Sequence, residues 1–371
     1  MLEETTSKNH LYDADWIAHV KGMHKNAFLW EDMDKPPLAL MIGKRDSMDG
    51  QQVMTDYRKQ FQDYRVLFEH ELENVADTLK VRSEILPLMY VNYGESLIPS
   101  LFGAQIKVPL DDQPPWVAPC INDINMVKDM EPAGMQKGLM PLTIKALKYF
   151  QKCAPSGVHI YPPGILSPMD IAYLLRGSDL YTDMYDTPKL VHKLLEILSD
   201  TIISAITYIK NKTGVFQDKP NGVYVPGLFL GDDTCVNVSP SMLEEFDIPY
   251  LKKITNAFDC KLCVHFCSNH ATPYNDIIPV FSHHEEIFGI STQMGLKYYC
   301  EHFEELKETN TAIHTGYCGS FQEAYKNVSF KEWAVKFIER FRKKWRSGLI
   351  LNAYVPTVNE AAEIWNIWRK L

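Results

Sequence analysis

A histidine and a cysteine two residues apart, His265 and Cys267, close an apolar run that begins at Lys261. Residues two apart on a β-strand point to the same face, so a strand here would project both side chains together, with Cys263 deeper on that face. Imidazole and thiolate are ligands that zinc prefers in proteins. The structural alternative is a buried strand in which His265 is hydrogen-bonded and Cys267 packs as a small apolar side chain.

Short apolar runs alternate along the chain with longer amphipathic helical segments, which is the pattern of an α/β fold. The predicted strands are Leu38–Ile42, Ile85–Tyr93, Val158–Tyr161, Gly222–Leu230, Lys261–Cys267, Glu286–Thr292, Thr311–Thr315 and Gly348–Asn352. Eight such strands are what a closed (β/α)8 barrel needs, and these barrels keep their chemistry at the C-terminal ends of the strands. We therefore predict a (β/α)8 (TIM) barrel with an N-terminal helical extension and insertions.

The chain shows no Gly- or Ser-rich linker and no internal repeat, which favours one domain. Residues 1–80 are predicted to form the helical extension and the first strand, as part of the same domain as the barrel in residues 81–371. The sequence predicts helix N-termini at three places. Thr187-Pro188 opens an apolar helical stretch, and Ser329 with Glu332 and Thr357 with Glu360 form capping boxes.

Composition describes an ordinary soluble globular protein of 371 residues, 46% hydrophobic and 23% charged. A net charge of −9 without a basic stripe disfavours a nucleic-acid binder, and no apolar run reaches the length of a membrane span. The first residues are acidic and polar, unlike a secretory signal. Eight cysteines over this length fit a reduced compartment better than a disulfide scaffold. We expect a cytoplasmic protein.

Polar side chains follow several predicted strands, where the rim of a barrel would gather them. Asp232 and Asp233 come directly after the fourth strand and are the candidate catalytic residues. The candidates for substrate binding are Asn92, Tyr93, Tyr161, Gln293, Tyr317 and Tyr354. Each has a structural alternative, because Asp232 could cap a helix and the tyrosines could serve only in packing. Their shared placement at one rim favours a site.

These motifs resemble those of the uroporphyrinogen decarboxylase superfamily. The resemblance is carried by Gly231-Asp232-Asp233, Val238-Ser239-Pro240, Ser167-Pro168-Met169-Asp170, Thr292-Gln293-Met294-Gly295 and His265-Phe266-Cys267-Ser268-Asn269. The last of these sits where the family carries a His-x-Cys-Gly-Asn sequence. The resemblance extends from about Glu84 to the C-terminus and implies a (β/α)8 barrel.

The superfamily contains two main chemistries. Its decarboxylases resemble one another in an arginine-rich N-terminal segment that grips the carboxylates of a tetrapyrrole, whereas the matching stretch, Ile42–Asp49, holds one arginine. Its corrinoid-dependent methyltransferases hold zinc with the His-x-Cys pair and a further cysteine after the eighth strand. In this chain Asn352-Ala353-Tyr354 occupies that place. The methyltransferase branch is the closer resemblance.

The sequence therefore does not identify the third zinc ligand. Cys318, just after the seventh strand, is the first candidate, and Asp232 or Asp233 could supply an oxygen instead. Ether-demethylating relatives are described with Asp, Cys and Cys ligands, which here would be Asp232, Cys260 and Cys300. Cys260 precedes the fifth strand, at the wrong end of a barrel, which counts against that set.

The resemblance implies a zinc-dependent methyltransferase. It would move a methyl group between a small methylated compound, a methoxylated aromatic or a methylamine-like donor, and a corrinoid carried by a partner protein, with zinc as Lewis acid. The alternatives are the reverse transfer from methylcorrinoid to a thiol, a divergent metal-free decarboxylase, and a non-catalytic barrel that binds a corrinoid protein or a small ligand. Relatives are commonly dimers, which implies a homodimer.

Overall fold

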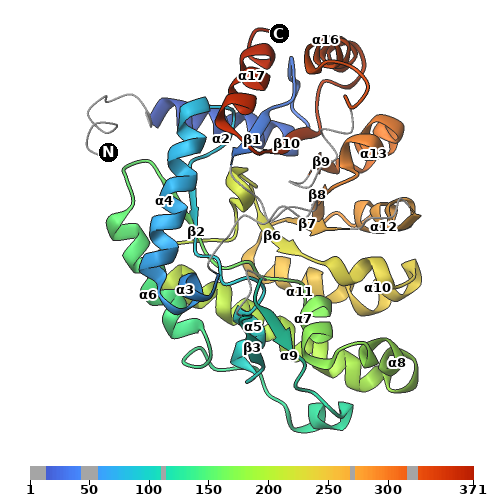
Figure 1. Cartoon of the computed structure of the whole chain (residues 1–371). Coiled ribbons are helices and arrows are strands. Elements are labelled where there is room, and N and C mark those ends of the chain that lie inside the picture. The colour runs from blue at the N-terminus through green and yellow to red at the C-terminus, as the bar shows by residue number, and fades with distance from the viewer. Residues whose placement is uncertain (1–13, 43–56, 110–113, 268–271, 316–324) are drawn as a thin grey trace.

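The computed structural model describes residues 14–42, 57–109, 114–267, 272–315 and 325–371, and all the parallel strands in them lie where the sequence predicts strands (Figure 1). These strands are β1 (Leu38–Ile42), β2 (Leu88–Tyr90), β5 (His159–Tyr161), β6 (Leu228–Gly231), β7 (Leu262–Phe266), β8 (Ile287–Thr292), β9 (Ala312–His314) and β10 (Leu349–Val355). The strand β6 begins later than the predicted Gly222, because Pro220–Gly222 forms a short 3-10 helix, η2. The predicted strands are therefore present, and the differences concern where some of them begin and end.

The strands follow one another around a barrel in the order of the chain. A six-stranded parallel ladder runs β1-β10-β9-β8-β7-β6, and β2 pairs in parallel with β5. A single bridge, Leu166 to Gly231, links the end of β5 to β6. The predicted α/β barrel is thereby confirmed, with one difference. In the described part of the chain no ladder joins β1 to β2, so the wall is not closed by backbone pairing.

Side chains take the place of the missing ladder on β1. The Leu38 N–H donates to Glu84 Oε2 at 2.7 Å, and the Leu40 N–H donates to Ser83 Oγ at 3.1 Å. One backbone bond, from Glu84 N–H to Leu38 O at 3.1 Å, also crosses the gap. Buried backbone donors need partners, and these bonds supply them without a paired strand.

Helices surround the strands (Figure 1). They are α2 (Ala14–Phe28), α3 (Tyr57–Gln62), α4 (Tyr64–Val81), α5 (Leu97–Leu101), α6 (Met140–Cys153), α7 (Pro168–Arg176), α8 (Asp179–Asp186), α9 (Pro188–Thr213), α10 (Pro240–Phe246), α11 (Ile248–Phe258), α12 (Thr272–Ser282), α13 (Gly295–Glu301), α14 (Phe303–Thr309), α16 (Phe330–Arg340) and α17 (Val358–Trp368), with the short helical turns η1 (Ile124–Asp129), η3 (Asp233–Asn237) and η4 (Phe341–Trp345). Both predicted N-caps are present: Ser329 and Thr357 accept the N–H groups of Glu332 and Glu360, each at 3.2 Å. None of the helices described combines the length and apolar character needed to cross a membrane.

The N-terminal helix α2 lies across the N-terminal ends of the strands. Its buried His24 has both ring nitrogens bonded, Nε2 with Glu84 O at 2.9 Å and Nδ1 with the Tyr224 N–H at 3.0 Å. One donor and one acceptor suit a neutral ring, and burial lowers the pKa of His24 to about 4. Phe28 follows on the same helix, and a Cβ on Gly289 of β8 would lie 2.6 Å from its ring. Glycine at 289 thus makes room for the helix that closes this end.

An insertion between β2 and α6 contains an antiparallel hairpin that the sequence did not predict. Its strands are β3 (Gln105–Lys107) and β4 (Trp116–Ala118). Strands of three residues are too short to show an alternating pattern, so the sequence does not indicate them.

Candidate metal centre

The strand β7 brings His265 and Cys267 together at its C-terminal end. His265 is buried, Cys267 directly after the strand is half-buried, and His265 Nε2 lies 3.1 Å from Cys267 Sγ. Cys263 is fully buried two residues deeper on the same face, and burial raises the pKa of its thiol. Strand alternation therefore places these side chains as expected, with the His-Cys pair at the rim and Cys263 in the core.

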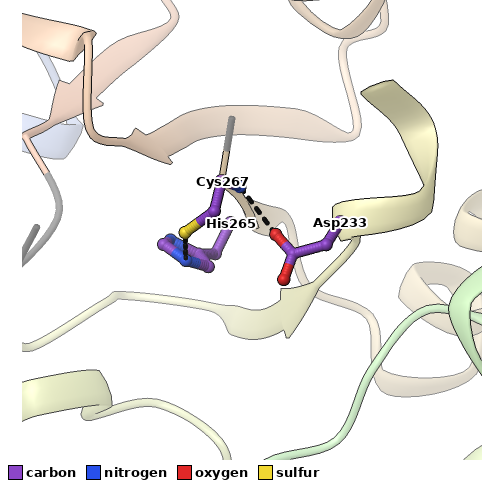
Figure 2. Close-up of side chains that lie close together, drawn as sticks. All are labelled: Asp233, His265 and Cys267. Carbon is purple, nitrogen blue, oxygen red and sulfur yellow. Dashed lines mark hydrogen bonds between the residues drawn. The ribbon is translucent and has the colours of Figure 1, made fainter. Parts of the chain in front are cut away.

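Asp233 completes a group of three possible metal ligands (Figure 2). It begins η3, directly after β6, and its Oδ1 accepts the Cys267 N–H at 2.6 Å. One ligand atom from each of Asp233, His265 and Cys267 lies within 4.8 Å of the other two. In the part of the chain that the structure describes, this is the one such group of His, Cys, Asp or Glu side chains found.

A serine on the neighbouring strand orients the imidazole. Ser291 lies opposite His265 in the β7–β8 register, and its Oγ is 3.0 Å from His265 Nδ1. When the hydroxyl accepts the Nδ1–H, the Nε2 lone pair faces Cys267 and Asp233, which is the tautomer that a metal ion needs. The Phe229 ring, 6.0 Å from the imidazole ring, forms an apolar side of the site.

The donor set fits zinc in spacing and in kind. Zinc bond lengths in a tetrahedral site put a nitrogen and a sulfur ligand about 3.5 Å apart, so the His265–Cys267 pair needs to open by only roughly half an ångström. Asp233 uses Oδ1 for the Cys267 N–H, which leaves Oδ2 for an ion. Nitrogen, sulfur and oxygen donors from three side chains leave a fourth tetrahedral position open, which is the arrangement of catalytic zinc.

Asp170 holds the loop that carries Asp233. Its two carboxylate oxygens accept the N–H groups of Asp233 at 2.8 Å and of Thr234 at 2.5 Å. Asp170 lies in the first turn of α7, where Ser167 caps the helix by accepting its N–H at 3.1 Å. Burial first, and then the charge of Asp233, raises the pKa of Asp170 to about 6. Burial also raises the pKa of Asp233.

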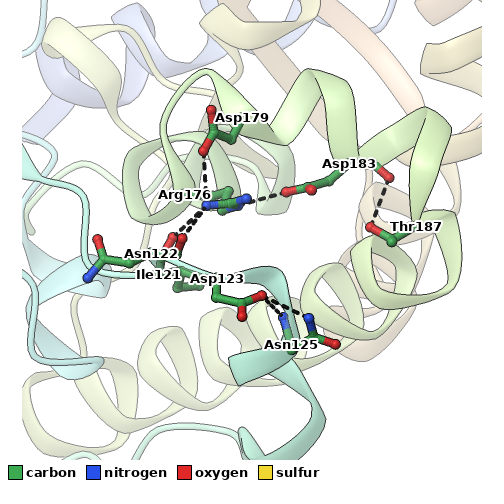
Figure 3. Close-up of polar contacts among 8 residues, drawn as sticks. All are labelled: Ile121, Asn122, Asp123, Asn125, Arg176, Asp179, Asp183 and Thr187. Carbon is green, nitrogen blue, oxygen red and sulfur yellow. Dashed lines mark hydrogen bonds and ion pairs between the residues drawn. The ribbon is translucent and has the colours of Figure 1, made fainter.

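Helix α7 is fixed at its other end by Arg176 (Figure 3). The guanidinium pairs with Asp183 at 2.7 Å and Asp179 at 3.1 Å, and donates to the carbonyls of Ile121 and Asn122 at 3.1 Å each. These bonds tie the insertion after β4 to α7 and α8. The helix that positions Asp233 through Asp170 is therefore anchored at both ends.

Asp232, predicted with Asp233 as a catalytic residue, does not join the ligand group. Its side chain is fully buried and accepts the Ser167 hydroxyl at 2.8 Å. Burial and the neighbouring Asp247 raise the pKa of Asp232 well above its usual range. Burial raises the pKa of Asp247 to about 7. Two buried carboxyls side by side favour at least one shared proton rather than two charges.

Glu95 is a further acid near the site. It follows β2, is accessible to solvent, and lies within electrostatic range of Asp170 and Asp233. Partial removal of water by the surrounding protein, and then these two charges, raises its pKa to about 7. A divalent cation beside Asp233 would offset this accumulation of negative charge.

The predicted substrate-binding residues fall in different surroundings. Tyr93 and Tyr161 are buried and pack in the core, Tyr93 on Phe61 with ring centroids 5.4 Å apart. Asn92 is exposed, and Gln293 and Tyr354 are half-buried at the C-terminal ends of β8 and β10. Tyr317 and the predicted third ligand Cys318 lie outside the described residues. The alternative cysteines Cys260 and Cys300 are not part of the ligand group.

Sequence reasoning missed the roles of Ser291, Asp170 and Glu95. Ser291 could have been found by extending the alternation rule to the next strand, where it is the last inward residue of the sixth predicted run. Asp170 is part of the Ser167-Pro168-Met169-Asp170 motif. Its bonds to distant backbone N–H groups, however, produce no regular residue spacing that could be recognised in the sequence. Glu95 lies two residues after Tyr93, one of the predicted substrate-binding residues, so its position at the rim could have been noticed.

Comparison with known proteins places the chain in a family. The family model described as uroporphyrinogen decarboxylase (URO-D) matches residues 91–278, just over half of the chain. The chain therefore belongs to the uroporphyrinogen decarboxylase family. A search of curated protein sequences gave no match.

Solved structures extend the comparison to the fold. A methyltransferase from Methanosarcina mazei superposes with a TM-score of 0.66 at 14% identity, covering 95% of this chain and 98% of that one. A B12-independent methionine synthase from Shewanella sp., in complex with selenomethionine, gives a TM-score of 0.49 at 12% identity, covering 90% of this chain and 98% of that one. The first likeness establishes a shared fold over nearly the whole length.

We predict that zinc binding depends on Cys267. The purified wild type, offered zinc, should hold about one ion per chain, and Cys267→Ala should lose most of it because one of three ligands is gone. Elemental analysis of both proteins measures this. Cys153→Ala, which removes an exposed thiol, is the control and should keep the metal. Equal zinc in the wild type and Cys267→Ala would contradict the site, and Cys318→Ala measured alongside tests the ligand predicted outside the described residues.

Asp170→Asn should weaken zinc binding without abolishing it. An asparagine has one acceptor oxygen for two N–H donors, so the Asp233 loop loses a bond and the carboxylate its orientation. Loss of such an outer partner typically lowers metal affinity by about 10–100-fold. Competition with a chromophoric chelator measures the affinity, with the exposed Asp186→Asn on α8 as control. An affinity equal to that of the control would show that Asp170 does not position the ligand.

Arg176→Met should destabilise the fold. The Arg176 and Asp183 side chains are 9% and 11% exposed, and removing one partner of a buried ion pair leaves the other charge uncompensated. We expect the free energy of unfolding to fall by about 3 kcal/mol. Urea denaturation measures it against Lys336→Met, whose pair with Glu332 is 73% and 51% exposed and should change stability by less than about 0.5 kcal/mol. Similar losses in both variants would refute the anchoring role.

Proposed function

We propose that the protein is a zinc-dependent methyltransferase that moves a methyl group from a small methylated donor to a corrinoid carried by a partner protein. The observation that carries the proposal is the Asp233–His265–Cys267 group at the C-terminal ends of β6 and β7, where barrels keep their chemistry. The fold shared with the Methanosarcina mazei methyltransferase supports methyl transfer over the decarboxylation for which the family is named.

In this proposal the ligand side chains hold the ion and leave one position for the donor. Bound zinc would act as a Lewis acid that withdraws electrons from the atom bearing the methyl group. His265 is oriented by Ser291, and Asp233 is oriented by the Cys267 N–H and by Asp170 through the loop. Glu95, with a pKa of about 7, can hold a proton at the rim near neutral pH.

The ligand chemistry favours demethylation of a donor over methylation of a thiol. Thiolates are soft ligands, and carboxylate oxygens are harder. A site with one thiolate and one carboxylate leaves more positive charge on zinc than a site with two thiolates. Such an ion is suited to an ether oxygen or an amine nitrogen, which agrees with a methoxylated aromatic or methylamine-like donor. Transfer to a thiol is the alternative direction.

The corrinoid protein as partner is part of the same proposal. A corrinoid is too large to enter a buried pocket, so it has to meet the donor at the open rim of the barrel, presented by its carrier protein. The acidic chain needs no nucleic acid or membrane for this reaction. The cytoplasmic location and the homodimer stay predictions.

The test is a methyl-transfer assay with the zinc-loaded protein. A reduced corrinoid protein is mixed with methoxylated aromatics or methylamines, and the corrinoid absorbance spectrum reports methylation. We expect turnover of at least one donor class, and a loss of about a hundredfold or more in His265→Ala, since Lewis-acid assistance is worth several kcal/mol. Cys153→Ala should be as active as the wild type.

Three outcomes separate the alternatives. Failure of every donor with zinc-loaded protein would refute donor demethylation. Methylation of a thiol from a methylated corrinoid would support the reverse direction. Release of carbon dioxide from a carboxylated pyrrole by zinc-free protein would instead support a decarboxylase.

A further inference from the structure

The opening in the barrel wall between β1 and β2 contains a pocket of about 250 Å³. Its sides are the end of β1, the strand β2 and the helices α3 and α4, which cover the opening from outside. None of the three metal-ligand residues lines it. A cavity of about 150 Å³ holds benzene, so this one has room for a ligand a few heavy atoms larger.

Glu71 of α4 gives the pocket its chemical character. Its Oε2 accepts the Tyr90 N–H at 2.7 Å, and its Oε1 accepts the Asn74 side-chain N–H at 3.4 Å. No lysine, arginine or histidine among the described residues forms an ion pair with it. Desolvation by the surrounding protein raises the pKa of Glu71 to about 7. A largely desolvated acid that lines a cavity, with no ion-pair partner in the described part of the chain, is suited to a cation from outside.

Aromatic residues are part of the lining of the same pocket. Tyr57, Tyr90 and Tyr354 come from α3, β2 and β10, three segments far apart in the sequence. The rest of the lining is apolar, as at Leu67 and Leu88, or polar, as at Asn92, and it includes His70, the neighbour of Glu71 on α4. Tyrosine rings attract cations through their faces, and sets of aromatic residues with an acid are how proteins bind methylated ammonium groups.

We propose that this pocket binds a small organic cation of the methylated ammonium class, with Glu71 as the counter-charge and the three tyrosines as its aromatic walls. The volume suits a ligand of the size of choline. A metal ion such as calcium is disfavoured because Glu71 is the one carboxylate among the described lining residues, and hard cations need several oxygen ligands. Two lining residues, Asn92 and Tyr354, are also predicted substrate-binding residues, but the proposal concerns binding alone and its test requires neither zinc nor methyl transfer.

Calorimetric titration with choline tests the site on the full chain. We expect the wild type to bind choline and to bind the neutral isostere, in which a tert-butyl group replaces trimethylammonium, at least about tenfold more weakly. Glu71→Gln should lose about tenfold or more in choline affinity, because it removes the charge. The glutamine keeps an oxygen for the Tyr90 N–H, so the helix and strand should stay together. A thermal midpoint close to that of the wild type checks this.

The control is Glu73→Gln, an exposed acid on the same helix, which should bind choline like the wild type. Absence of choline binding by the wild type would overturn the proposal. Equal affinity for the neutral isostere, undiminished binding by a folded Glu71→Gln variant, or equal losses in the Glu71 and Glu73 variants would also overturn it. Choline binding that persists in zinc-free Cys267→Ala protein would confirm that the pocket is separate from the metal centre.

Discussion

The parallel register of β6 and β7 is the constraint on which the candidate metal centre depends. Gly231 lies opposite His265 at the end of the paired register, and the Asp232 N–H donates to His265 O at 2.7 Å, which brings Asp233 to Cys267. The bond from the Cys267 N–H to Asp233 Oδ1 fixes that meeting point. Because side chains alternate with a period of two, a slip of one residue would turn His265 and Cys267 out of the barrel together. The arrangement of the three ligands therefore depends first on how the two strands pair.

The second requirement is electrostatic. Three buried carboxyls, Asp170, Asp232 and Asp247, lie near Asp233, and Glu95 is within electrostatic range of it. Repulsion among so many acids would disfavour the fold if all were ionised. Backbone N–H donors stabilise the charge of Asp170, while the raised pKa values of Asp232, Asp247 and Glu95 favour their protonated forms. A bound cation would offset the charge of Asp233, so the acids around the site favour an ion there.

The barrel could be predicted because its strands are buried and its helices have caps, and both leave signals in the sequence. The His265–Cys267 pair could be predicted for the same reason, since alternation along one strand is a local rule. The roles of Asp232 and Asp233 could not be separated, because two adjacent acids after a strand look alike until the loop conformation is known. That conformation is set by Asp170, from a helix some sixty residues earlier. Long-range bonds between a side chain and a backbone have no sequence period to reveal them.

The same reasoning explains why the side pocket exists. Where β6 and β7 pair in register, their ends converge and build a compact ligand group. Where β1 and β2 do not pair, the side chains of Ser83 and Glu84 satisfy the β1 donors, and the wall stays open. An unpaired wall would normally leave buried N–H groups without partners, so these two side chains make the opening tolerable. Helix α4 then covers the gap with Glu71 facing into it. The pocket is therefore a built feature of the barrel, specified by residues that replace a ladder rather than by the absence of one.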